Sequence, residues 1–165
     1  MKRPDLIKFK NDSKTILCRS FKAVSPEEGC SILIGRKQQP ATIGPQNIWQ
    51  IIEIWPCCNS WETEKLPSYD SLKLNRTKKR PSLNSKANRF FIDPREQLTA
   101  QRWCRAKDYQ ILGFAHSHPN GDNKPSSIDL EWHNYPGLMI IVDKYDLIEA
   151  WWIKNKKKFH RVQLL

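Results

Sequence analysis

The chain has 165 residues, enough for one domain with a sizeable core, and we expect a single domain over residues 1–165. Its 28 Lys and Arg residues against 17 Asp and Glu give a formal net charge of +11, which suits an acidic protein partner or a nucleic acid. No apolar run is long enough to span a bilayer or to form a signal segment, so we expect a cytoplasmic protein without a membrane partner.

Helices and strands are predicted to mix along the chain without a regular βαβ repeat. The predicted helices are an amphipathic one over Ser13–Val24, with Leu17, Phe21 and Val24 on one side, and one over about Pro94–Lys107, with Leu98, Ala100, Trp103 and Cys104 buried. The predicted strands are Cys30–Gly35, Ile48–Trp55, Arg89–Asp93, Tyr109–Ala115, Leu138–Asp143, Leu147–Ile153 and Phe159–Leu165. This order indicates an α/β or α+β sheet flanked by helices.

Two further features concern the cysteines and a long connection. The five cysteines, Cys18, Cys30, Cys57, Cys58 and Cys104, show no metal-binding spacing, and their odd number fits reduced thiols. Cys57 to Asn88 is a polar, basic stretch interrupted by Pro67 and Pro81. A connection of this length is either functional or a solvated, flexible loop, and both readings stay open.

The segment His116-Ser117-His118-Pro119 carries the strongest chemical signal. Side chains on a strand alternate between its faces, so His116 and His118 at i and i+2 project from the same side. Pro119 is expected to end this strand and open it into the loop that follows. The two imidazoles are therefore placed to share one metal ion.

A third ligand is predicted in the element after that loop. Ser126 is suited to cap a short helix, and Asp129 falls in the first turn of that helix, facing the two histidines. Two imidazoles and one carboxylate suit zinc, and catalytic zinc sites keep a fourth position for water. Trp132, just beyond Asp129, is expected at the rim of the pocket, whereas most of the seven tryptophans are expected in the core.

Other readings of this segment are possible. Two histidines on a strand are often ordinary surface or core residues. Asn120, Asp122 and Lys124 occupy alternating positions, as in a calcium loop, but a lysine at a ligand position argues against calcium. The spaced serine and aspartate favour the zinc site.

The spacing His-x-His, seven residues, Ser, two residues, Asp resembles the signature of the JAMM, or MPN-domain, zinc metallopeptidases. Two other segments extend the likeness. Glu28-Gly29-Cys30-Ser31 with Gly35 is similar to the family segment Glu-x-Cys-Gly, with Ser31 in place of a glycine, and Phe90 to Leu98 resembles the approach to the metal site in bacterial stand-alone members. The resemblance implies an MPN or cytidine-deaminase-like fold, a curved mixed β-sheet flanked by helices.

The resemblance also implies roles for residues. His116, His118 and Asp129 would hold one zinc ion with a bound water, Glu28 would be the general base, and Ser126 would hydrogen-bond the oxyanion. Glu28 also suits this role on chemical grounds, because attack of water on an amide requires a group that takes up a proton and returns it to the leaving amine. Family members carry substrate-contacting insertions near Cys57 to Asn88.

The expected function is therefore zinc-dependent hydrolysis of a peptide or isopeptide bond. The resemblance implies a substrate with a Gly-Gly-like C-terminal tail, as in ubiquitin-like proteins and the bacterial sulfur carriers. Two other classes remain, a non-catalytic MPN scaffold and a basic nucleic-acid-binding metalloprotein. The second is disfavoured because the basic residues are spread along the chain and match no nucleic-acid-binding motif. The oligomeric state is not predicted.

Overall fold

The computed structural model describes residues 2–38, 47–61, 85–133 and 135–165. The helices are α1 (Ser13–Val24), α2 (Pro94–Ala106) and α3 (Ser127–Trp132), and the strands are β1 (Leu6–Phe9), β2 (Cys30–Gln38), β3 (Ile48–Cys57), β4 (Gln110–His118), β5 (Gly137–Asp143), β6 (Ile148–Asn155) and β7 (Lys158–Leu164). Most of the predicted Cys57 to Asn88 loop, residues 62–84, lies outside the described residues. None of the helices in the described part of the chain is long and apolar enough to cross a membrane.

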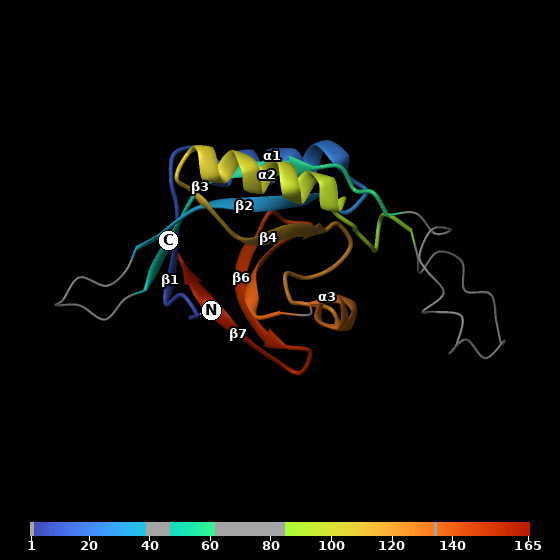
Figure 1. Ribbon diagram of the computed structural model, residues 1–165. Coiled ribbons are helices and arrows are strands. Elements are labelled where there is room, and N and C mark those ends of the chain that lie inside the picture. Colours follow the sequence, from blue (N-terminus) through green and yellow to red (C-terminus); the bar gives the residue numbers. More distant parts are fainter. Residues whose placement is uncertain (1, 39–46, 62–84, 134) are drawn as a thin grey trace, which may run out of the picture.

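The seven strands form one mixed sheet that closes on itself in the order β1, β3, β2, β4, β5, β6, β7 (Figure 1). The pairs β1–β3, β1–β7 and β4–β5 are parallel, and the other pairs are antiparallel. The predicted mixture of helices and a mixed sheet is therefore confirmed. Its closure was not predicted, because it depends on the short β1, which no local pattern indicated.

The strand β2 passes between the two main clusters of the core. Leu33 belongs to the larger cluster, which α1 enters through Leu17 and Phe21, whereas Ile32 and Ile34 pack in the cluster beneath α2. Because neighbouring residues of a strand face opposite ways, α1 and α2 cover opposite faces of β2. In the view of Figure 1 these two helices lie at the top and α3 lies below β4.

Three sequence predictions are corrected by the structure. Arg89–Asp93 is not a strand: Phe90 and Ile92 are apolar because they pack beneath α2, outside the sheet. Leu98 was predicted to be buried in the second helix, but it is 56% exposed, because Ala100 and Cys104 form the buried side of α2. Val24, at the end of α1, is also exposed.

The tryptophans only partly follow the prediction that most of them lie in the core. Trp49, Trp61 and Trp152 are buried, while Trp55, Trp103 and Trp151 are only partly buried. Trp132 is 49% exposed. Several of the tryptophan rings therefore lie partly at the protein surface and not wholly in the core.

Candidate metal centre

The strand β4 supplies the two histidines. It runs through His118 and ends before Pro119, as predicted, because backbone pairing with β5 continues to the register His118 with Asp143. His116 also pairs with Cys30 of β2, so this end of β4 is held on both sides. The loop that begins at Pro119 then leads to α3.

Ser117, between the histidines, points the other way and fixes a second segment. Its buried hydroxyl accepts a hydrogen bond from the Gly29 amide at 2.8 Å, and its own amide donates to the Gly29 carbonyl at 2.9 Å. A Cβ on Gly29 would lie 2.5 Å from Cδ1 of Phe21 and 3.1 Å from its Cα. Glycine therefore allows the chain just after Glu28 to lie against both β4 and α1.

The third residue of the group, Asp129, is oriented by a capping box. The amide of Asp129 donates to Ser126 Oγ at 3.2 Å, and the amide of Ser126 donates to Asp129 Oδ2 at 2.7 Å. The predicted helix cap at Ser126 is thus confirmed. The same two bonds that start α3 hold the carboxylate in the direction of β4.

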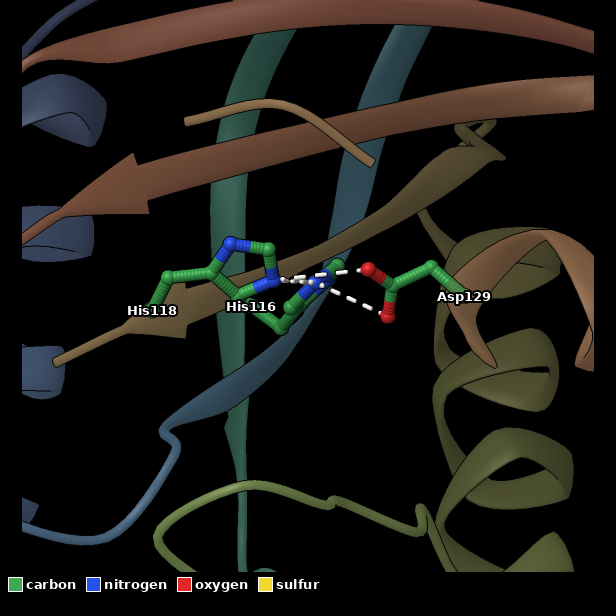
Figure 2. Close-up of side chains that lie close together, drawn as sticks. All are labelled: His116, His118 and Asp129. Carbon is green, nitrogen blue, oxygen red and sulfur yellow. Dashed lines mark hydrogen bonds and ion pairs between the residues drawn. The ribbon is translucent and has the colours of Figure 1, made fainter. Parts of the chain in front are cut away.

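Figure 2 shows the two imidazoles and the carboxylate pointing toward one another. The Nε2 atoms of His116 and His118 are 3.0 Å apart, Asp129 Oδ1 lies 3.3 Å from His116 Nε2, and Oδ2 lies 3.4 Å from His118 Nε2. Ligands at zinc bond lengths of about 2.0–2.1 Å in a tetrahedral arrangement are about 3.3 Å from each other. The spacing of these donor atoms therefore fits a zinc ion.

The ring of His118 has a defined tautomer. Its Nδ1 lies 2.7 Å from the carbonyl oxygen of Asp122, which accepts a hydrogen bond only if Nδ1 carries the proton. In the neutral ring the lone pair is then on Nε2 and directed at the shared point, which is the usual arrangement for a histidine that binds a metal. The side chain of Asp122 accepts from the Lys124 amide instead, so this loop is organised around His118.

Charge in the group is unevenly distributed. Burial lowers the pKa of His116, which is 1% exposed, and so favours the neutral form of this ring. Burial also acts against a charge on His118, but the hydrogen bond and attraction to Asp129 raise its pKa. Burial alone would raise the pKa of Asp129, yet the two imidazoles and Ser126 hold it well below its usual range. A neutral ring beside an ionised carboxylate is the donor set that a divalent cation requires.

Glu28 lies just before β2 and is 7% exposed. Burial raises its pKa to about 7, with a smaller contribution from the Asp129 carboxylate and opposing ones from His118 and Arg89. A carboxylate that titrates near neutrality is suited to take up and release a proton. The neighbouring Glu27 is exposed.

Glu28, His116 and Asp129 line one cavity of about 520 Å³. Phe90 stacks on the His116 ring, with centroids 4.5 Å apart, and Trp61 and Trp132 meet edge to face at 5.8 Å in the same cavity. The position of Trp132 at the rim agrees with its prediction. The roles of Phe90 and Trp61 in the cavity wall were missed, because an aromatic residue in a sequence gives the same signal in a core as in a cavity wall.

Within the described residues, His116, His118 and Asp129 are the only group of three or more His, Cys, Asp or Glu side chains close enough to share a metal ion, with ligand atoms within 4.8 Å of one another. The five cysteines form no disulfide and are free, as predicted. Among the described residues, the candidate metal ligands thus lie together, two at the end of β4 and one on α3.

Comparisons with known proteins agree with this geometry. A family model described as prokaryotic homologs of the JAB domain matches residues 13–154. A desampylase from Pyrococcus furiosus is 31% identical over 87 residues, which cover 52% of this chain and 61% of the relative, so the chain spans about three fifths of that relative's length.

Two solved structures share the fold. A solution structure of a Desulfitobacterium hafniense protein has 20% identity and a TM-score of 0.71, covering 96% of this chain and 91% of its own. A solution structure of a Salinibacter ruber protein has 22% identity and a TM-score of 0.53, covering 96% and 90%. At these identities the likeness concerns the fold alone.

Proposed function

Because the chain belongs to the prokaryotic JAB-domain family, we propose that it is a zinc-dependent isopeptidase of the JAMM type. The observation that carries this proposal is the convergence of His116, His118 and Asp129 on one point, at a cavity that the buried Glu28 lines together with His116 and Asp129. The burial of Glu28 beside the metal group supports a hydrolase over a scaffold, because hydrolysis at this metal group needs a residue that accepts and returns a proton there.

His116, His118 and Asp129 are proposed to hold one zinc ion, which when bound supplies a Lewis acid and lowers the pKa of water. Glu28 accepts the proton of the attacking water and returns it to the leaving amine. The oxygen of the Ser126 hydroxyl accepts a hydrogen bond from the Asp129 amide, so the hydroxyl proton is available to donate to the oxygen of the scissile carbonyl.

The proposed substrate is the C-terminal tail of a ubiquitin-like or sulfur-carrier protein, joined to an amine. The relative from Pyrococcus furiosus supports this class, because its name, desampylase, refers to the removal of a ubiquitin-like modifier. Part of the cavity wall is aromatic, and Trp61, Phe90 and Trp132 would lie along an extended tail. Part of the Cys57 to Asn88 loop is proposed to contribute as well.

The experiment that tests this function compares three substrates. These are a ubiquitin-like protein linked through its last glycine to a lysine side chain, the same protein with a linear C-terminal extension, and an unfolded peptide with the same last residues. Zinc-loaded protein is expected to cleave the first two substrates and chelator-treated protein neither. Zinc binding without cleavage of any substrate would favour the non-catalytic scaffold.

Trp132 provides a prediction about substrate contact. Its indole is 49% exposed at the cavity rim, so Trp132→Ala is expected to weaken binding of the tail and raise KM roughly tenfold with little change in kcat, the pattern of lost uniform binding. Steady-state kinetics on the isopeptide substrate measure both constants. The control is Tyr145→Ala, at an exposed aromatic residue that does not line the cavity. A fall in kcat with an unchanged KM would remove Trp132 from the binding surface.

A further inference from the structure

The side chain of Asn59, just after β3, makes an unusually complete set of hydrogen bonds. Its Nδ2 lies 3.0 Å from the carbonyl oxygen of Glu28, 2.8 Å from that of Arg89 and 3.4 Å from that of Lys86. Its Oδ1 accepts from the amides of Trp61, at 3.0 Å, and Phe91, at 3.2 Å. An amide has two donor hydrogens and two acceptor lone pairs, and here all of them are used.

These bonds connect three separate segments of the chain. Glu28 precedes β2, Trp61 follows β3, and Lys86 to Phe91 leads toward α2. Two backbone bonds run in parallel: the Glu28 amide donates to the Lys86 carbonyl at 2.7 Å, and the Ser60 amide donates to the Phe91 carbonyl at 2.9 Å. These segments belong to no common strand ladder, so Asn59 takes the place of sheet pairing between them.

The connected segments carry the walls of the cavity. Glu28, Trp61, Arg89 and Phe91 all line it, and Phe90 stacks on the ring of His116. On its other side, the chain at Gly29 is fixed to Ser117 of β4. The main chain of Glu28 is therefore held between the strand that bears the histidines and the segment that Asn59 organises.

We infer that Asn59 is a positioning residue, which holds the main chain of Glu28 and the wall at residues 89–91 in a fixed relation to the metal group. The catalytic consequence of this inference rests on the proposed function. The tie, by which we mean the five hydrogen bonds of the Asn59 side chain, does not depend on that function. An amide is required because Asp would offer no donor to the three carbonyl groups, and Leu would leave five backbone polar groups without this partner.

The first arm of the test measures hydrogen exchange in metal-free protein and needs no activity. Asn59→Ala removes all five contacts, whereas Asn59→Asp keeps the two accepted bonds and turns a carboxylate oxygen toward the three carbonyl groups, so the two variants disturb the tie in different ways. Amides in residues 26–30 and 85–91 are expected to exchange roughly tenfold faster or more, while those of β6 and β7 stay unchanged. Asn155→Asp is the control, because Asn155 caps the turn before β7 through its Oδ1. Unchanged exchange in both segments would overturn the inference.

The second arm is a double-mutant cycle with Glu28→Gln. In the wild-type background Asn59→Asp is expected to lower kcat roughly ten- to a hundredfold with bound zinc unchanged and KM within about threefold. In the Glu28→Gln background the further loss should be less than about threefold, because the base is already missing. An equal loss in both backgrounds would contradict positioning of Glu28. If the wild type cleaves no substrate, the proposed function fails. The hydrogen-exchange measurement then tests by itself whether Asn59 holds the two segments in place.

Discussion

Glu28 is the residue whose environment contributes most to the proposed chemistry. It is buried without a cation in direct hydrogen-bond contact among the bonds described, and burial raises its pKa to about 7. In JAMM-type chemistry this is an advantage, because a base that titrates near neutrality both accepts and returns a proton. In folding it is a cost, because an ionised Glu28 is less well solvated in the folded state than in the unfolded state.

This cost gives a prediction for the pH dependence of stability in metal-free protein. The pKa of Glu28 is about 7 when folded against 4.5 when unfolded, so the folded state binds the proton more tightly, and stability from this group is present at low pH and lost as pH rises toward 7. From pH 5 to pH 8.5, Glu28→Gln is expected to gain about 2–3 kcal/mol in unfolding free energy relative to wild type. Denaturant titrations in chelator measure this difference. Glu27→Gln, at the exposed neighbour, should show the same pH dependence of the unfolding free energy as wild type. The same result for Glu28→Gln would mean that Glu28 is solvated in the folded state.

At the scale of elements, α3 illustrates how local structure and chemistry coincide. The helix has only six residues, and its capping box holds the carboxylate that faces the histidines. An isolated helix of this length is unstable in water, so its geometry depends on the cap and on the loop organised around His118. Ser126 is therefore important for the helix whether or not it contacts the substrate.

Two variants of Ser126 separate these roles. Ser126→Ala is expected to lower the unfolding free energy by about 1 kcal/mol, because the cap is lost. It should keep bound zinc, since the Ser126 amide still donates to Asp129, and should lower the cleavage rate roughly 10²- to 10³-fold. Glycine is nearly as good a cap as serine, so Ser126→Gly should restore stability but not rate. Recovery of the rate with glycine would show that the hydroxyl acts only as a cap, and Ser127→Ala serves as the control.

Local patterns in the sequence predicted most elements, and the exceptions have physical reasons. The His-x-His strand and the Ser126 cap could be predicted because side-chain alternation and capping depend on residues near in sequence. The strand Leu6–Phe9 was missed because it has four residues and forms only through pairing with β3 and β7, far along the chain. Arg89–Asp93 was wrongly predicted to be a strand, because the apolar residues Phe90 to Ile92 line the cavity and do not belong to the sheet. The amide of Phe91 donates to the Asn59 side chain and not to a neighbouring strand.

At the scale of the whole molecule, the pairing of β2 with β4 brings the parts of the site together. Glu28 lies just before β2 and the histidines at the end of β4, and the antiparallel pairing of these strands sets Cys30 opposite His116. Glu28 and the histidines, which are far apart in sequence, are thus brought close together by the pairing register of these two strands. The sequence motif indicated which residues act together, but only this long-range pairing explains why they meet.

Zinc is expected to stabilise the whole fold, because the three ligands lie together only in the folded state. At a free zinc concentration about 100 times the dissociation constant, the unfolding free energy should rise by about 2.7 kcal/mol. Thermal unfolding with and without chelator measures this increment. His118→Gln should abolish it, whereas His160→Gln, on β7, should retain it. An equal increment in both variants would place the bound zinc elsewhere.

The most direct test of the central claim is the cleavage rate of an isopeptide-linked ubiquitin-like conjugate by wild type and Glu28→Gln, compared at equal bound zinc. Both proteins are expected to bind one zinc ion, and the rate of Glu28→Gln is expected to be lower by roughly 10²- to 10⁴-fold, because only the proton acceptor has been removed. Undiminished cleavage by Glu28→Gln would contradict the assignment of Glu28 as the base.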